Sequence, residues 1–247
     1  MTQGPLYPKV IAAYEENERG EDARVLAERI VDRDGGELKV VHVEEGSPAD
    51  TLQALAERGD ADLIVLGSTH RATIGSVAPG SVAEHLLHGA RCRLVIAPKG
   101  YSAGDHSEDR LRVVGVGFDG IAESHAALEE AAKLARRFGA SMRVIGVATP
   151  VPALGAAAAA QAGPLHTDFQ TQLQEAVAEL NPELRALAVL ERGDPVEKLL
   201  AAAETGLDLL VLGSRGFGPV MRLLLGSVSS RVIRRAACPV LVVPRPG

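Results

Sequence analysis

The chain has 247 residues, of which 46% are hydrophobic and 23% charged, and its net charge is −6 at pH 7. This apolar content is enough for a globular core, but no apolar run reaches the roughly 18 residues of a membrane helix, and the negative charge argues against a nucleic-acid partner. The stretch Met1–Lys9 has no signal-peptide pattern and only two cysteines occur, so we expect a cytoplasmic protein in which Cys92 and Cys238 are small core residues.

Short apolar strands alternate with helical segments in the amino-terminal part of the chain. The pattern predicts a strand at Lys9–Tyr14, a helix near Glu21–Val31, a strand at Leu38–Val43 and a helix near Ala49–Arg58. A further strand, helix and strand follow. The polar segment Lys99–Arg110 contains two Gly and two Ser and has the composition of a linker.

The same alternation continues after the linker. Strands are predicted at Leu111–Phe118, Met142–Val147, Leu184–Leu190, Leu207–Gly213 and Val240–Val243. Helices are predicted near Glu123–Phe138, Asp168–Leu180, Pro195–Glu204 and Ser227–Ala236. Continuously apolar strands are typical of a parallel sheet buried on both faces, and the alternation with helices predicts a doubly wound α/β fold with right-handed crossovers.

Two copies of one pattern make up the chain. The stretch Asp62–Ser68 (DLIVLGS) matches Asp208–Ser214 (DLLVLGS) at an offset of 146 residues (208 − 62). Gly80-Ser81 meets Gly226-Ser227 at the same offset (226 − 80), without a gap. Such self-similarity predicts two tandem α/β domains, which we place at residues 1–100 and 111–247.

The first copy is the shorter one. It has 57 steps from Val10 to Gly67 (67 − 10), against 100 from Val113 to Gly213 (213 − 113). We expect that the first domain is truncated by one strand–helix unit, because loss of a strand at the sheet edge leaves the remaining strand pairing intact.

The residues after the fourth strand of the second copy are suited to an anionic ligand. Open parallel sheets bind ligands at the carboxyl ends of their strands, where the winding reverses. Gly213 and Gly216 lack a Cβ and allow a tight turn or a close backbone approach. Gly226 and Ser227 open the last helix, whose free N–H groups and dipole favour an anion, and the Ser227 and Ser229 hydroxyls can donate to phosphate oxygens. Taken singly, the glycines also fit a simple turn and Ser227 an N-cap.

The spacing Gly-x2-Gly-x9-Gly-Ser from Gly213 to Ser227, followed by a helix and a Cys-Pro-Val-Leu-Val-Val strand, resembles the universal stress protein family, here as a tandem pair. The resemblance implies the HUP fold of adenine nucleotide alpha hydrolase-like domains, and ATP as the ligand of many members. It assigns the phosphate and ribose positions to Gly213, Arg215, Gly216, Gly226, Ser227, Val228 and Ser229. We expect Mg²⁺ to bridge the phosphates.

Two further positions follow from the same resemblance. Asp119, at the end of the first strand of the second copy, matches the acidic residue beside the base and ribose, and its carboxylate can accept from a ribose hydroxyl. Val147, at the end of the next strand, matches the position whose backbone N–H and C=O read the adenine edge. Arg215 is the expected cation for the phosphates. ATP, AMP and a cyclic nucleotide remain alternatives.

The first copy departs from this pattern. Gly67, Gly80 and Ser81 are present, but His70 stands at the place of the second glycine, and Glu16 is taken as the counterpart of Asp119. An imidazole at His70 would crowd the phosphate path. We therefore expect the second domain alone to bind nucleotide.

Several other motifs are given structural interpretations. Gly115–Gly120 satisfies G-x-G-x-x-G, but Gly115 falls inside a strand and no acid ends the next strand, which argues against a Rossmann dehydrogenase. His85 and His88 are expected on a solvated helix face rather than in a metal site. The biased segment Pro150–Pro164 is either a lid over the nucleotide or a disordered insertion.

These features favour a stress-response ATP-binding protein that acts as a nucleotide-dependent switch or adaptor rather than an enzyme. No general base or in-line nucleophile is evident in the motif. A slow ATPase or ATP-using transferase is the first alternative, and a nucleotide-free structural adaptor the second. The family's last strands commonly pair, so Arg93–Ala97 and Val240–Val243 are expected to join the domains as an intrachain pseudo-dimer, with a further homodimer left open.

Overall fold

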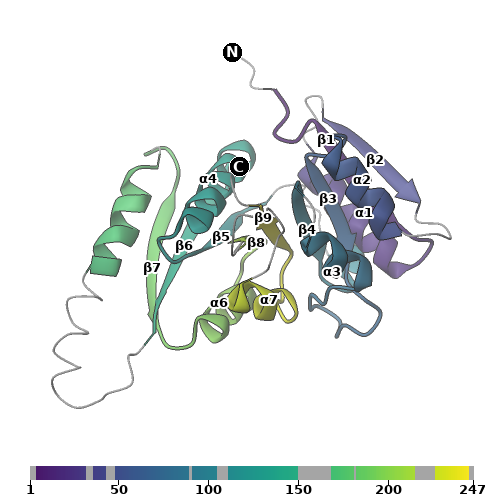
Figure 1. Ribbon diagram of the computed structural model, residues 1–247. Helices are drawn as coiled ribbons and strands as arrows, with labels where there is room; N and C mark the ends of the chain where they lie inside the picture. The colour runs from purple at the N-terminus through teal and green to yellow at the C-terminus, as the bar shows by residue number, and fades with distance from the viewer. Residues whose placement is uncertain are drawn as a thin grey trace.

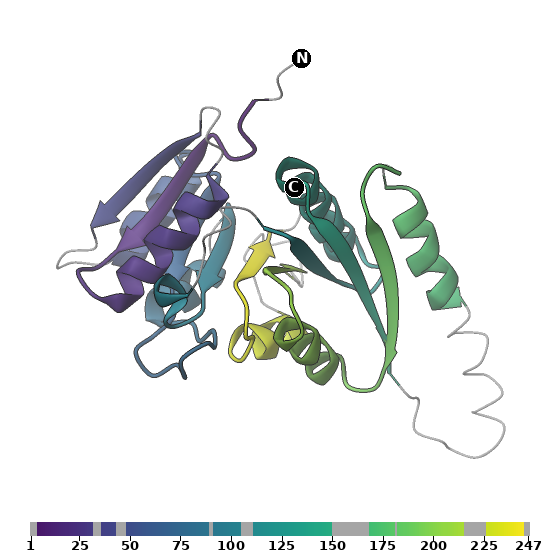
Figure 2. The same cartoon turned by 180° about the vertical axis from the view of Figure 1, so that it is seen from behind.

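Figure 1 shows the computed structural model, which describes residues 4–31, 36–42, 48–88, 91–104, 111–149, 168–180, 182–214 and 226–244. The nine strands of this described part form one sheet in the order β2-β1-β3-β4-β9-β8-β5-β6-β7. Helices pack on both faces of the sheet, as Figures 1 and 2 show from opposite sides. The predicted doubly wound α/β class is therefore confirmed.

The first half, up to residue 104, follows the predicted alternation closely. Its elements are β1 (Lys9–Tyr14), α1 (Glu18–Ile30), β2 (Glu37–His42), α2 (Pro48–Glu57), β3 (Leu63–Gly67), α3 (Ser81–Leu87), β4 (Arg93–Ala97) and the 3-10 turn η1 (Tyr101–Ala103). The strand order β2-β1-β3-β4 is parallel throughout, and the winding reverses between β1 and β3.

The second half, from residue 111, adds one strand and one helix to this plan. Its labelled elements are β5 (Val113–Phe118), α4 (Ala122–Phe138), β6 (Ser141–Ala148), β7 (Ala186–Arg192), α6 (Pro195–Glu204), β8 (Leu209–Gly213), α7 (Ser227–Ile233) and β9 (Val240–Val243). Residues 168–178 are also helical. That helix and β7 are the unit without a counterpart among the described residues of the first half.

The two halves are joined by their last strands. β4 pairs with β9 in the antiparallel sense, with Leu94 opposite Val242 and Ile96 opposite Val240. All other pairs in the described sheet are parallel. The pairing expected between Arg93–Ala97 and Val240–Val243 is present, and it makes one sheet out of two.

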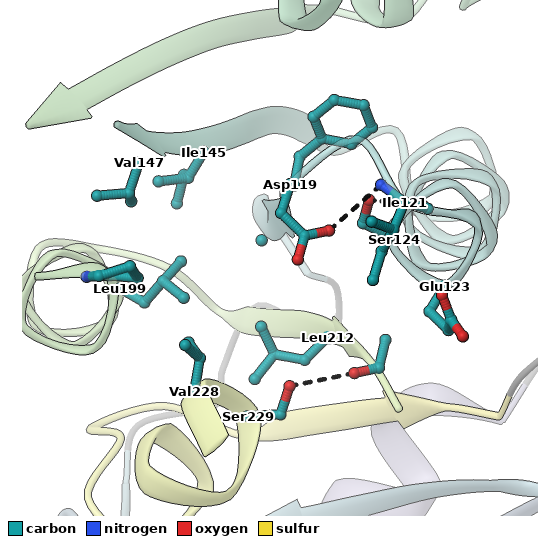
Figure 3. A pocket seen from close by; sticks show the side chains of 14 residues that line it. Asp119, Ile121, Glu123, Ser124, Ile145, Val147, Leu199, Leu212, Val228 and Ser229 are labelled. Carbon is teal, nitrogen blue, oxygen red and sulfur yellow. Dashed lines mark hydrogen bonds between the residues drawn. The ribbon is translucent and has the colours of Figure 1, made fainter. Parts of the chain in front are cut away.

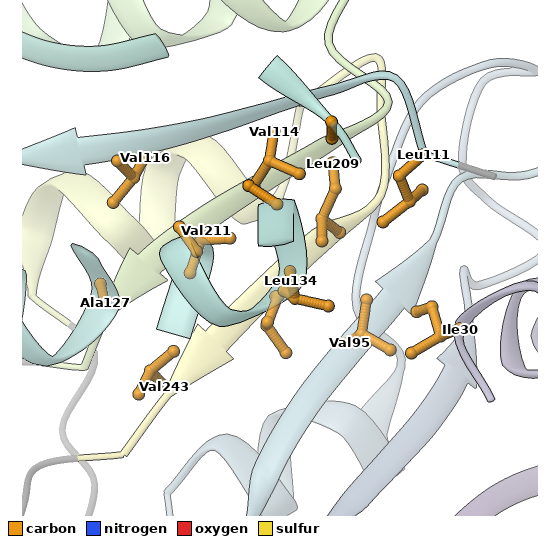
Figure 4. Packing of buried hydrophobic residues seen from close by; sticks show 14 of the residues in the cluster. Ile30, Val95, Leu111, Val114, Val116, Ala127, Leu134, Leu209, Val211 and Val243 are labelled. Carbon is orange, nitrogen blue, oxygen red and sulfur yellow. The ribbon is translucent and has the colours of Figure 1, made fainter. Parts of the chain in front are cut away.

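Each face of the sheet carries one apolar core that extends across both halves. In the core beneath α1 and α4, Ile30 and Val95 of the first half pack with Leu111 and Leu134 of the second (Figure 4). The opposite core, beneath α2, α3, α6 and α7, also draws on both halves. Burial of one such leucine side chain contributes about 1.5–3 kcal/mol to the stability of the fold. Because both cores include residues of both halves, they stabilise the contact between the halves as well as each half.

A buried polar cluster also crosses from one half to the other. Glu130 of α4 is 2% exposed; its Oε1 accepts from the Tyr7 hydroxyl at 2.7 Å and its Oε2 from Arg93 Nη2 at 3.0 Å. The Arg93 guanidinium lies 5.7 Å from the centroid of the Tyr7 ring. Burial raises the pKa of Glu130, but the hydrogen bonds from Arg93 and Tyr7 outweigh it and bring that pKa below its usual range. Glu130 is thus held as a carboxylate, which accepts from both Arg93 and Tyr7.

No helix of the described residues is both long enough and apolar enough to pass through a lipid bilayer.

Candidate functional site

Three strands end and three helices begin around one cavity in the second half (Figure 3). β5, β6 and β8 contribute their carboxyl ends, and α4, α6 and α7 their first turns. The winding of this half reverses between β5 and β8. The cavity therefore lies where open parallel sheets bind their ligands.

One side of the cavity is apolar. Its side chains come from β6, α6, β8 and α7, and they are Ile145, Val147, Pro195, Leu199, Leu212 and Val228. Figure 3 shows Ile145, Val147 and Leu199 gathered at the side away from α4. The cavity volume is about 100 Å³, below the roughly 300 Å³ at which sites begin to enclose a whole drug-sized ligand. The space fits one ring system of a larger ligand.

The other side of the cavity is polar and acidic. Asp119 directly follows β5, and its Oδ1 accepts from the Ile121 N–H at 3.4 Å at the start of α4. The Ser124 hydroxyl donates to the Ile121 carbonyl at 2.9 Å, which ties the same turn. Glu123, which is 9% exposed, also lines the cavity. The described lining contains these two carboxylates and no lysine or arginine.

Gly213, at the end of β8, is required by its neighbour on α4. A Cβ at Gly213 would lie 2.7 Å from the carbonyl carbon of Glu123 and would also overlap the Glu123 carbonyl oxygen. The glycine was expected to allow close approach of backbone to a ligand. In the structure it allows close approach of β8 to the first turn of α4, so one residue both lines the cavity and permits that packing.

The start of α7 forms a further wall of the cavity. Gly226 is the N-cap, Ser227 is the first helical residue, and Val228 points into the apolar side. The Ser229 hydroxyl donates to the Gly213 carbonyl at 3.1 Å. Its proton is thus engaged within the protein, and donation to a phosphate would require this bond to break.

The structure brings five of the nine expected residues around one cavity, namely Asp119, Val147, Gly213, Val228 and Ser229. Gly226 and Ser227 lie at the adjoining helix start. Arg215 and Gly216 lie outside the described residues, as does the segment Pro150–Pro164. Sequence reasoning missed Glu123, Ile145 and Leu199, although Glu123 and Leu199 belong to helices that directly follow strand ends.

The chain is matched by known proteins along most of its length. The sequence profile described as "Universal stress protein family" matches residues 2–98 and 110–244. This chain belongs to the universal stress protein family. A universal stress protein of Mycobacterium tuberculosis (strain ATCC 25618 / H37Rv) is 31% identical over 85% of this chain and 74% of its own length. One of Mycolicibacterium smegmatis is 30% identical over 97% of this chain and 81% of its own length.

The fold agrees with that of solved family members. The crystal structure of a universal stress protein from Archaeoglobus fulgidus DSM 4304 superposes with a TM-score of 0.63 over 97% of this chain and 98% of that chain. The sequence identity is 20%. The likeness therefore supports the tandem fold itself.

The first half of this universal stress protein has a cleft at the equivalent place, and it is nearly closed. Its volume is about 30 Å³. The lining includes Glu15, Arg19, Gly67 and Gly80. Arg19 pairs with Glu15, and its Nη1 lies 3.6 Å from the position that a Cβ on Gly80 would take. The guanidinium side chain thus extends across the cleft from Gly67 to Gly80. The hydrogen bond from Arg19 lowers the pKa of Glu15.

Strand register corrects the residue matched with Asp119. Val10 lies opposite Leu63, and Val114 opposite Leu209. Because Leu63 and Leu209 are repeat partners, the offset between the first strands is 104 residues (114 − 10), and the counterpart of Asp119 is Glu15, not Glu16. The counterpart of Glu123 is then Arg19, so the halves differ in the sign of one charge at the cleft.

An imidazole at His70 was expected to crowd the phosphate path of the first copy, and this stays a prediction. His70 is exposed and is absent from the lining, and its carbonyl accepts from Lys99 Nζ at 3.0 Å. The side chain that fills the cleft is that of Arg19. It lies in the first turn of α1, outside the glycine motif from which the sequence argument started.

Other titratable groups have the expected structural settings. Cys92 and Cys238 are buried, and burial raises the pKa of each thiol to about 12. His85 is exposed on α3 and His88 is exposed at its C-cap, and His85 Nε2 lies 2.8 Å from Gln53 Oε1. Within the described part of the chain no cluster of three or more metal-ligating side chains occurs.

Proposed function

We propose that the protein is a stress-response adaptor or switch that binds ATP with Mg²⁺ through its second half. The observation that carries the proposal is the convergence of Asp119, Val147, Gly213 and Val228 on one cavity at the strand ends. These residues come from four elements and lie far apart in the sequence. A nucleotide site of this family requires these positions to lie around one cavity. Residues that only formed separate turns would have no reason to lie together.

The cavity suits the uncharged part of a nucleotide. A base fits between Ile145, Val147 and Leu199, where the lining is apolar. The β5–β6 ladder ends at the pair Phe118–Gly146, so Val147 is the first residue of β6 beyond the end of β5. Its backbone would meet the base edge, and the Asp119 carboxylate would accept from a ribose hydroxyl.

The phosphates would lie toward the start of α7. Gly226 and Ser227 would hold them, together with Arg215 and Gly216. Ser229 would join them on exchanging its hydrogen bond to the Gly213 carbonyl for one to a phosphate oxygen. A triphosphate carries several negative charges of its own, so its binding in a partly enclosed site is favoured by a counter-charge. Mg²⁺ would supply that charge, and we expect ATP to bind tightly only in its presence.

We propose that the first half binds no nucleotide. The support is the ion pair of Arg19 with Glu15, which occupies the first cleft. Glu15 is the counterpart of Asp119, so the carboxylate that would accept from a ribose is already engaged. The two halves, as domains 1–100 and 111–247, would then act as an intrachain pseudo-dimer in a cytoplasmic protein, with one half as sensor and the other as its partner.

A switch requires that ATP bind two conformations with different affinity. α4 offers a route for such an effect, since its first turn lines the cavity and Glu130 lies at the junction with the first half. The rival function is a slow ATPase or ATP-using transferase. A nucleotide-free adaptor is the other rival.

Isothermal titration of the full chain with ATP, ADP, AMP and cyclic AMP, each with and without Mg²⁺, tests the proposal. We expect one ATP site per chain. Asp119→Ala should weaken ATP binding by about tenfold or more, since a hydrogen bond to a charged group contributes about 1.5–3 kcal/mol. Glu16→Ala is the matched control, because Glu16 is an exposed acid of the first half.

Three results would contradict the proposal. Two ATP sites per chain would refute binding by the second half alone. Failure of any of these nucleotides to bind, with none found by mass spectrometry of gently purified protein, would favour the nucleotide-free adaptor. Steady phosphate release that is lost in both Asp119→Ala and Gly226→Val would favour the enzyme.

A further inference from the structure

An ion pair lies beside the apolar side of the cavity, on β7 and α6. Glu191 Oε2 of β7 is 3.0 Å from Lys198 Nζ of α6. Their side chains are 41% and 37% exposed, respectively, so both remain accessible to solvent and to a ligand. Neither residue belongs to the glycine motif or to the lining described above.

Strand register fixes where this pair lies relative to the cavity. Val147 of β6 is directly opposite Glu191 of β7. Neighbouring strands are about 4.8 Å apart, and residues opposite each other point to the same face of the sheet. The contact of Glu191 with Lys198 confirms that its side chain is on the α6 face, where Val147 and Leu199 line the cavity. Glu191 is therefore the neighbour of Val147 on this face of the sheet, one strand closer to the edge formed by β7.

We consider a base held between Val147 and Leu199 with its C6–N7 edge toward β7, where the C6 group is what differs between adenine and guanine. Adenine has an amino group at C6, which donates hydrogen bonds, whereas guanine has a carbonyl oxygen there, which accepts them. A carboxylate only accepts. Glu191 would accept from the amino group of adenine and would repel the guanine oxygen.

We infer that Glu191 determines the preference of this site for adenine over guanine, and that Lys198 is a positioning residue that holds the carboxylate. The inference rests on the proposed function, because it assigns a further residue to the same site. Lys198 is connected to the cavity through Leu199, the next residue of α6. Its ammonium group, 3.0 Å from Glu191 Oε2, holds the carboxylate on the side of the base.

The test compares the affinities of the full chain for MgATP and MgGTP by titration calorimetry. The unaltered protein should prefer ATP by about tenfold or more. In Glu191→Gln the side-chain amide both donates and accepts, so we expect GTP binding to improve and the ATP/GTP ratio to fall by about tenfold. Lys198→Met should lower the ratio by a smaller factor. Glu197→Gln, at an exposed neighbour on α6, should leave it unchanged.

The outcomes separate this inference from the proposed function. If ATP binds and the ratio stays the same in Glu191→Gln, or if both affinities fall equally, Glu191 has no role in base choice and the inference is overturned. Equal binding of ATP and GTP by the unaltered protein overturns it as well, while leaving a nucleotide site in place. Binding of neither nucleotide refutes the proposed function and this inference with it.

Discussion

Removal of Glu130 tests whether the polar cluster stabilises the junction between the halves. Glu130→Ala deletes the acceptor of the Tyr7 hydroxyl at 2.7 Å and of Arg93 Nη2 at 3.0 Å. Loss of one partner from a buried ion pair costs about 3–5 kcal/mol. The Arg93 side chain is 31% exposed and water can solvate the charge that remains, so we expect the lower end, about 3 kcal/mol.

The effect should depend on pH in one direction. The folded-state pKa of Glu130 is lowered, mainly by its hydrogen bonds to Arg93 and Tyr7 acting against burial. The carboxylate therefore stabilises the fold above the unfolded-state pKa of about 4.3, and this contribution is lost as the pH falls through the folded-state pKa. The difference between the unaltered protein and Glu130→Ala should be largest near neutral pH and should shrink below about pH 4.

Urea unfolding at a series of pH values measures this difference in the free energy of unfolding. Glu129→Ala is the matched control, because Glu129 is the exposed neighbour on the same helix. A cost below about 1 kcal/mol for Glu130→Ala at neutral pH would refute the reasoning, since it falls within the range of surface pairs. A cost that is equal at pH 7 and in acid would refute the role of the charge.

Three further predictions concern Gly213 at the end of β8 and the repeat partners Ser68 and Ser214, which follow β3 and β8. Gly213→Ala should destabilise the fold by about 3 kcal/mol or more, because the new Cβ would overlap the backbone of Glu123, which cannot move away. Gly4→Ala is the control, since a Cβ at Gly4 would have nothing within 4 Å. Equal thermal stability of the two variants would count against the argument. Ser68→Ala should cost about 1–3 kcal/mol, since the Ser68 hydroxyl donates to the Ala97 carbonyl at 2.6 Å and accepts from the Ala78 N–H at 3.0 Å. Ser214→Ala should be neutral or slightly stabilising, because the buried Ser214 Oγ has no hydrogen-bond partner in the described structure, and a large cost there would show that a partner exists.

The fold was largely predictable because parallel strands buried on both faces are continuous apolar runs. β3 and β8 read LIVLG and LLVLG, and both are buried almost throughout. β5 and β9 were predicted to within two residues of their observed bounds. The pairing of β4 with β9 was expected from the family resemblance, whereas its antiparallel direction was not predicted, because the strand sequences do not encode the direction of pairing.

The residues expected at the site came from the glycine and serine motif and, for Asp119 and Val147, from the family resemblance. Leu199 and Ile145 line the cavity because α6 packs over β6, and the sequence of α6 looks like any amphipathic helix. The match of Asp119 with Glu16 was wrong by one residue, since it assumed an offset of 103 residues (119 − 16) between the first strands, whereas the pairing register gives 104 (114 − 10). Arg19 was missed because it lines the cleft through its contact with Gly67, which the sequence alone does not show.

The position of α4 gives the adaptor hypothesis a physical route. Glu123 in its first turn touches the backbone beside Gly213, and Glu130 is seven residues further along (130 − 123). At a rise of about 1.5 Å per residue, the two side chains are attached about 10 Å apart on one rigid rod. A nucleotide that shifts the first turn of α4 must therefore either shift Glu130 against Tyr7 and Arg93 or bend the helix. In the first half the equivalent helix α1 is held at the cleft by the ion pair of Arg19 with Glu15. Under the proposed function, α4 is therefore the element through which a nucleotide bound in the second half would act on the junction between the halves.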